Sequence, residues 1–283
     1  MFKSIRNAFK VKELRGKILY TFMMLVVIRF GSQLPIPGIE TSFFADWFAR
    51  QTTNAFGFFN AMTGGSFSSM SIFALSITPY ITSSIIIQLL TIAIPRLEEL
   101  QKDGEDGRKK IQEYTRYTTV GLALFESAAM AIGFGRQGLL LDYNVGNIIV
   151  AVVTMTTGSA LLMWIGEQIT EKGVGNGISI VLLFNILSSV PDDMRNLYYR
   201  FIFGQTIPTM VIAAVIIAAV ILAMVVFVIV LNDAERRIPV QYSKKMVGRK
   251  MVGGQASSIP LKVNTAGVMP VIFASSIMSF PVV

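Results

Sequence analysis

Long apolar segments alternate along the chain with short stretches that hold most of its charged residues. About 20 apolar residues in a helix cross the hydrocarbon core of a bilayer, which is about 30 Å thick. Seven segments match or approach this pattern, and they cover residues 18–34, 72–94, 117–134, 147–165, 178–190, 207–231 and 263–283. The pattern therefore predicts an all-α, polytopic membrane protein.

Composition supports this interpretation and excludes several kinds of chemistry. Of the 283 residues, 53% are hydrophobic and only 15% are charged, which leaves too little polar surface for a soluble protein of this length. The chain has no cysteine and no histidine, so it lacks disulfides, thiol nucleophiles, histidine bases and the usual zinc ligands. It also has no GxxxxGK[ST] phosphate loop. We expect no cofactor and no enzymatic activity.

The basic residues orient the predicted spans. Six precede the first segment, six lie between the second and third, one lies between the fourth and fifth, and seven lie between the sixth and seventh. The alternate loops hold only four, and Arg29 lies within a span. The positive-inside rule then places residues 1–17 and the loop 233–262 in the cytoplasm and the loop 191–206 outside. Basic cytoplasmic loops could also meet ribosomal RNA or anionic lipid.

Three segments are irregular for a plain helix bundle. Residues 54–70 are rich in Gly and Ser, too polar to span and too apolar for a solvated loop, so they form either a short re-entrant helix or an interfacial loop. Pro79 within the second span removes a backbone donor there. The fifth segment, 178–190, has only 13 residues and follows Gly173, Gly175 and Gly177, so either its start is unwound or the membrane is thin there.

Polar side chains within spans seek partners, because an unpaired polar group in hydrocarbon is costly. Gln88 and Asn264 are amides suited to interhelical bonds. Arg29 and Glu126 lie twelve residues past the cytoplasmic markers Lys17 and Tyr114, at a similar depth of about 18 Å. We hypothesise that Arg29 and Glu126 form an ion pair.

Five long motifs occur in order over nearly the whole chain: RFGSQLPIPGIE (29–40), SIFALSITPYITSSIIIQLL (71–90), GRKKIQEYTRY (107–117), MWIGEQITEKGVGNGISI (163–180) and PLKVNTAGVMPVIFASSI (260–277). Together they resemble the SecY family, whose members are the central subunits of the Sec protein translocase. The resemblance implies two five-span halves around an hourglass pore. This chain would supply the first half, residues 18–190, and the start of the second, residues 207–283, with the sixth span and part of the seventh. The family has ten spans, so the chain is expected to be a fragment.

The resemblance also implies roles for particular residues. Residues 56–70 match the plug, a short helix that closes the external funnel, here with Phe56, Phe58, Phe59, Met62, Gly64, Gly65 and Phe67. The apolar pore ring matches Ile77, Ile81, Val174, Ile178 and Ile272. Val174 replaces the commoner isoleucine and should widen the ring slightly. The lateral gate, through which signal helices reach lipid, matches Gln88, Thr118 and Asn264. The cytoplasmic loop matches the docking site for the ribosome or the SecA motor, with Arg236, Arg237, Lys244, Lys245, Arg249 and Lys250.

The implied function is a channel in the bacterial plasma membrane that passes unfolded preproteins and releases signal peptides or transmembrane helices sideways into lipid. The implied partners are SecE, SecG, SecA and the ribosome. The residues leave an alternative open, a secondary transporter for a small solute, because a broken helix and buried charges suit such a protein. An apolar ring favours the channel, since small-solute sites need converging polar groups.

Overall fold

The computed structural model describes residues 11–42, 44, 54–204, 207–240, 245–247, 250–252, 257–265, 267 and 274. It divides into two compact units. One unit is Met1–Asp193 with Phe273–Val283, and the other is Met194–Ile272. Each unit is described by itself.

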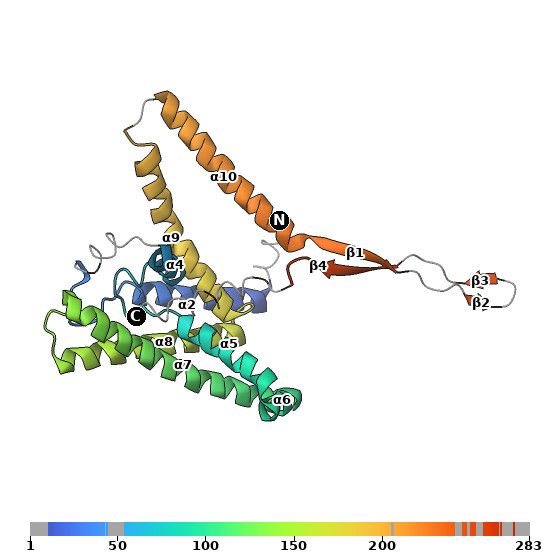
Figure 1. Ribbon diagram of the computed structural model, residues 1–283, viewed down its shortest axis with the longest axis horizontal. Helices are drawn as coiled ribbons and strands as arrows, with labels where there is room; N and C mark the ends of the chain where they lie inside the picture. Colours follow the sequence, from blue (N-terminus) through green and yellow to red (C-terminus); the bar gives the residue numbers. More distant parts are fainter. Residues whose placement is uncertain are drawn as a thin grey trace. The chain divides into compact units, whose positions relative to one another are not determined.

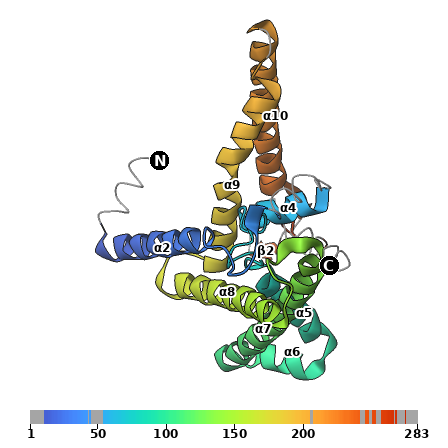
Figure 2. The ribbon, with the colours of Figure 1, turned by 90° about the vertical axis from the view of Figure 1, so that its left-hand side faces the viewer.

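The first unit is helical, and α7 packs against both α8 and α5 (Figures 1 and 2). Its hydrophobic core lies between α7, α8 and the segment 36–75. Its elements are α2 (Lys12–Gly31), α4 (Asn54–Thr63), α5 (Thr78–Ala93), α6 (Pro95–Lys102), α7 (Glu105–Phe134), η1 (Gly135–Leu139), α8 (Val145–Lys172) and the first part of α9 (Gly177–Phe201). Helices α7 and α8 contribute small and flexible side chains to this core, among them Ala123, Met130, Ala151 and Met155. Small residues let helix backbones approach closely, which stabilises helix packing in a membrane.

The second predicted span begins later than its apolar pattern suggested. Residues 72–77 form turns, and α5 starts at Thr78 with Pro79 in its first turn. A proline in the first turn costs no hydrogen bond, because the first N–H groups of a helix have no partner inside it. Pro79 therefore removes no hydrogen bond from within the helix, contrary to the expectation of a missing donor inside the span.

A sharp bend separates α5 from α6. Their axes meet at 103° around Ile94, whose backbone is extended (φ −110°, ψ 112°). Proline disfavours a helical conformation in the residue before it, so Pro95 ends α5 and begins α6. Helix α6, with sequence PRLEELQK, has no buried residue, as expected for a segment that leaves the apolar layer.

The fifth helix is longer than the 13 residues expected. Helix α9 runs for 25 residues, through Pro191, to Phe201. Residues 191–201 are therefore helical, although they were expected in an external loop. The residues before it, 173–176, are not helical, which agrees with an unwound start. The apolar pattern ended early because Asp192 and Asp193 are charged, and charge does not end a helix that has already left the hydrocarbon.

The second unit holds the end of α9, the long helix α10 (Ile207–Asp233) and two antiparallel β-ribbons (Figure 1). Strand β1 (Glu235–Val240) pairs with β4 (Ser257–Lys262) in a register that places Glu235 opposite Lys262. Strand β2 (Lys245–Val247) pairs with β3 (Lys250–Val252). The ribbons add short strands to the predicted all-α membrane fold. The repeat KMV-GR-KMV was a usable signal, because two β-prone triplets separated by two residues including Gly favour a hairpin.

Among the described residues, four helices are long and apolar enough to cross a membrane, namely α7, α8, α9 and α10. A fifth span is obtained if α5 and α6 are taken as one bent span. Helix α2 has 20 residues but carries Lys17 and Arg29. Nearly all of the seventh predicted span, 263–283, lies outside the described residues.

Candidate functional site

Two of the predicted ring residues lie at the start of α5. Ile77 precedes the first turn and is fully buried, and Ile81 is nearly so. The Ile77 carbonyl accepts the backbone N–H groups of Tyr80 and Ile81, at 3.1 and 3.2 Å. These bonds tie Ile77 and Ile81 to the same turn at the start of α5.

The other two described ring residues lie around the turn that joins α8 to α9. The Val174 N–H donates to Thr21 Oγ1 of α2 at 3.2 Å, and Gly177 N–H donates to Thr170 Oγ1 of α8 at 2.8 Å. Asn176 Oδ1 accepts the N–H groups of Ile178 and Ser179, at 3.1 and 3.2 Å, and so caps α9. These bonds fix the non-helical turn on both sides.

Gly166 of α8 brings the two pairs together. A Cβ atom built on Gly166 would lie 3.1 Å from Ile178 Cγ1 and 3.6 Å from Ile77 Cδ1. Ile77 and Ile178 therefore both pack over this glycine. Val174 is more open, with 39% of its surface exposed, and Ile272 lies outside the described residues. The structure thus places two of the five predicted ring residues beside each other and a third, Ile81, one turn along α5.

The predicted plug contains a short helix, α4, that ends at two glycines. The N–H groups of Gly64 and Gly65 donate to the carbonyls of Ala61 and Asn60, at 3.2 and 3.1 Å. Both glycines have left-handed backbones (φ +66° and +82°), the usual way to end a helix. Met62 is buried, whereas the side chains of Phe56, Phe58 and Phe59 lie outside the described residues. A short helix is therefore present in residues 54–70, one of the two forms considered for this segment.

The part of the predicted plug that follows Gly65 is built into the core. Phe67 is buried, and its ring meets Phe44 edge to face at 5.4 Å. Two backbone bonds tie the next residues to the chain after α2: Ile36 N–H to Met70 O at 3.1 Å and Ile72 N–H to Leu34 O at 2.9 Å. Gly64 and Gly65 therefore join α4 to a segment that is bonded into the core, and this junction is called the pivot.

Arg29, in the last turn of α2, contacts this pivot. Its Nη1 donates to Gly64 O at 3.2 Å and to Ser188 Oγ of α9 at 3.3 Å. Among the ion pairs between described residues, none joins Arg29 to Glu126. The hypothesis that the two pair is wrong, because neutral acceptors on the plug and on α9 take the place of the carboxylate.

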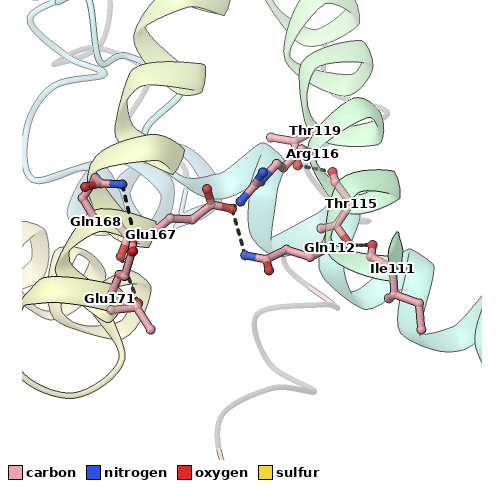
Figure 3. A network of polar contacts seen from close by, with 10 residues as sticks. Ile111, Gln112, Thr115, Arg116, Thr119, Glu167, Gln168 and Glu171 are labelled. Atoms are coloured by element: carbon pink, nitrogen blue, oxygen red, sulfur yellow. Dashed lines mark hydrogen bonds and ion pairs between the residues drawn. The ribbon is translucent and has the colours of Figure 1, made fainter. Parts of the chain in front are cut away.

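A polar network that sequence reasoning missed connects α7 to α8 (Figure 3). Arg116 Nε donates to Glu167 Oε1 at 2.8 Å, and Gln112 Nε2 donates to the same oxygen at 3.2 Å. Glu167 follows Gly166 directly, so the network lies beside the ring glycine in sequence. Arg116 was counted only as an orienting charge. Its position in the motif GRKKIQEYTRY, and that of Glu167 in MWIGEQ, were the available signals.

The predicted gate residues are not hydrogen-bonded to one another in the described part of the chain. Gln88 is exposed on α5. Thr118 of α7 is half-buried and donates to Tyr114 O within its own helix at 2.8 Å. Helices α5 and α7, which carry these two residues, do pack together. Asn264 belongs to the other unit, where its Oδ1 accepts the Gly267 N–H at 3.0 Å.

The predicted docking residues belong to the β-ribbons. Arg236 and Arg237 are exposed on β1, opposite Leu261 and Pro260 of β4. Lys245 and Lys250 lie in β2 and β3. Lys244 and Arg249 lie outside the described residues.

Comparison with known families and proteins identifies the family of the chain. The family model described as SecY matches residues 71–283. The chain is 44% identical, over 99% of its length, to the protein translocase subunit SecY of Halalkalibacterium halodurans. It is 42% identical, over 95% of its length, to that of Escherichia coli strain K12. The chain belongs to the SecY family. It spans 66% and 61% of these two SecY proteins, respectively.

Solved structures agree on the fold. A structure described as that of a protein conducting channel matches 94% of this chain and 56% of its own, with a TM-score of 0.56 and 18% identity. Sec61 in a canine ribosome–channel complex matches 94% of this chain and 57% of its own, with a TM-score of 0.53 and 17% identity. The predicted SecY-type, multi-pass membrane fold is therefore confirmed, with the β-ribbons as an addition.

Proposed function

We propose that the chain forms part of a protein-conducting channel that passes unfolded polypeptide across the bacterial plasma membrane. The observation that carries this proposal is the convergence of Ile77, just before α5, and Ile178, in the first turn of α9, over Gly166, in a chain of the SecY family. Branched apolar side chains make no fixed hydrogen bonds, so a ring of them tolerates any passing sequence. When empty, such a constriction can lose its water and block ions.

The apolar ring also argues for a passive channel over an enzyme or a small-solute transporter. A transporter site near the middle of the membrane needs polar groups that face its substrate. Here Ile77 and Ile81 are buried apolar side chains, and the helix that carries Ile178 starts from a tightly bonded turn. Energy for transport would come from partners such as the SecA motor or a translating ribosome.

The remaining assignments follow from the same family membership. The pairing of α5 with α7 is the side of the first half that would open as a lateral gate, with Gln88 and Thr118 on it and Asn264 facing them in the assembled channel. The exposed Arg236 and Arg237 would dock the ribosome or SecA, and SecE and SecG would complete the complex. Positive charge would keep the N-terminus and the ribbons in the cytoplasm.

A crosslinking experiment tests the channel. The chain is joined to the portion of the Halalkalibacterium halodurans relative that lies beyond the match, and this product is called the extended chain. Because the chain has no natural cysteine, Ile81→Cys supplies a single thiol in the ring. A stalled secretory precursor carries a second cysteine in its translocating segment. We expect a disulfide between the two.

Leu89→Cys is the matched control, since Leu89 lies on the same helix but is half exposed. It should give no disulfide with the same precursor. The chain as given is tested in parallel, and a disulfide there too would mean that residues 1–283 suffice to surround a substrate. A stably inserted extended chain that crosslinks at neither position, or equally at both, would refute the pore assignment.

A further inference from the structure

Arg29 is a charged residue near the end of a predicted span, where a cation must be well hydrogen-bonded. Two features stabilise the Arg29 charge at this position. It lies in the last turn, where the helix dipole attracts positive charge. Its Nη1 also has two acceptors that do not belong to α2, the Gly64 carbonyl and Ser188 Oγ. Both acceptors are neutral, so the charge is stabilised by the position of the plug and of α9.

The backbone at Gly64 lies between Arg29 and α9. A Cβ atom on Gly64 would lie 2.6 Å from Ser188 Oγ and 2.7 Å from the Asn185 carbonyl oxygen, so the plug backbone lies directly against α9. Ser188 Oγ also lies 3.5 Å from Gly64 O. Its hydroxyl proton goes to the nearer Asn185 carbonyl at 2.7 Å, which leaves the oxygen free to accept from Arg29.

The same contacts lead to the ring. Asn185, which is buried, donates its side-chain N–H to Ser76 Oγ at 3.1 Å. Ser76 has a left-handed backbone (φ +53°), a strained conformation for a residue with a side chain. It directly precedes Ile77. The polar side chains of one face of α9 therefore contact both the plug pivot and the residue that positions the first ring isoleucine.

We propose that Arg29 is a positioning residue for the plug and acts as a latch on its pivot. The guanidinium holds the Gly64 carbonyl against Ser188, so α4 cannot swing about Gly64 and Gly65 until these bonds break. Displacing the plug would leave the partly buried guanidinium with fewer acceptors, which raises the free energy of the open state. This inference rests on the proposed channel function.

The test measures passive chloride permeability of proteoliposomes that contain the resting extended chain. Arg29→Gln should raise the permeability about tenfold, which corresponds to about 1.4 kcal/mol in the closed–open equilibrium. Arg29→Lys keeps the charge and a hydrogen-bond donor group on a shorter side chain, so its increase should be smaller. Arg136→Gln is the matched control, because Arg136 is an exposed arginine predicted on the same side of the membrane. It should leave the permeability unchanged.

A double-mutant cycle separates a latch from general destabilisation. Ser188→Ala should raise the leak less than Arg29→Gln does, and the two together should leak no more than Arg29→Gln alone, because both remove the same contact. Ser188→Ala with Arg136→Gln should be additive. If Arg29→Gln fails to fold, Ser188→Ala alone must still raise the leak. Unchanged permeability in Arg29→Gln, or additive effects of Arg29→Gln and Ser188→Ala, would overturn the latch.

Precursor transport by the unmutated extended chain distinguishes the two levels of the proposal. If that chain crosslinks and transports a precursor but Arg29→Gln does not leak, the latch fails and the channel stands. If it neither crosslinks nor transports, the proposed function fails.

Discussion

At the residue scale, glycines decide how closely the ring isoleucines approach. A Cβ atom on Gly177 would overlap the Gly166 carbonyl oxygen, so α9 can begin this close to α8 only with glycine at position 177. Gly166 in turn leaves just enough room for Ile77 and Ile178 to meet above it. The separation of the ring isoleucines therefore depends on α8 as well as on the isoleucine side chains.

Gly166→Val should disturb the ring directly. The new side chain would enter the space taken by Ile178 Cγ1 and Ile77 Cδ1, and such overpacking costs about 1–3 kcal/mol. We expect a lower midpoint of thermal unfolding in detergent and a higher resting ion permeability of the extended chain. Gly121→Val is the control, because a Cβ atom at Gly121 of α7 meets nothing within 4 Å. Equal effects at the two glycines would contradict this role of Gly166.

Asn176 should contribute measurably to the start of α9. Its side chain accepts two N–H groups in the first turn, so Asn176→Ala should cost about 0.5–2 kcal/mol of stability. Asn176→Asp should restore most of the loss. Asn144→Ala is a matched control, since Asn144 precedes α8 but its side chain makes no capping bond. Thermal unfolding in detergent measures all three variants, and a loss in Asn144→Ala as large as in Asn176→Ala would argue against the cap.

At the scale of elements, apolar pattern located the helices but misjudged their ends. It predicted both ends of α10 to within two residues, because that segment is one uninterrupted apolar run. It began the second span six residues early, because residues 72–77 are apolar and buried yet form turns. It ended the fifth span eleven residues early at charged residues that continue the helix beyond the hydrocarbon. Hydropathy indicates which residues avoid water. Helix ends depend instead on capping bonds, prolines and tertiary contacts.

The ion pair between Arg116 and Glu167 should stabilise the packing of α7 on α8. Their N–O distance is 2.8 Å, but the Arg116 side chain is 45% exposed, so water weakens the attraction. A double-mutant cycle with Arg116→Gln and Glu167→Gln should give a coupling free energy of about 0.5–1 kcal/mol in thermal or denaturant unfolding. Both variants keep hydrogen-bonding groups of similar size, which limits new cavities.

A second ion pair of α7 provides the reference for this cycle. Lys109 and Asp106 lie 3.8 Å apart, with side chains 71% and 93% exposed. A cycle with Lys109→Gln and Asp106→Asn should give a coupling close to zero, because both groups are solvated in either state. The Glu167 side chain is only 14% exposed. Equal coupling free energies in the two pairs would show that this burial does not strengthen the ion pair.

At the scale of the whole molecule, the resemblance of the motifs predicted more of the candidate site than physical patterning did. Spacing showed that Ile77 and Ile81 share a helix face, but only the family motifs suggested that Ile178 lies near them. The hypothesis that Arg29 pairs with Glu126 rested on their similar depth in the membrane. It was wrong because depth does not determine the direction in which a side chain points. The contacts of Gly64 and Ser188 with Arg29 depend on a turn between distant segments, which no local pattern reports.

The distribution of charge makes one prediction about the whole chain, its orientation in the membrane. Helix α10 has 27 residues and is about 40 Å long, enough to separate its two ends by the full hydrocarbon core. Phe203 lies before it and Ser258 after it, and both are exposed. Phe203→Cys should react with a membrane-impermeant maleimide in right-side-out vesicles, and Ser258→Cys only in inside-out vesicles.

This orientation is expected because seven basic residues lie between the sixth and seventh predicted spans, and basic residues resist transfer across the membrane. Reaction of Ser258→Cys in right-side-out vesicles would reverse the orientation and place Arg236 and Arg237 outside. Neither a ribosome nor a cytoplasmic motor could then reach the β-ribbons, and the docking proposal would fail even if the ring and plug assignments held. Orientation is therefore the measurement on which the proposed partners depend, and it is independent of whether the pore conducts.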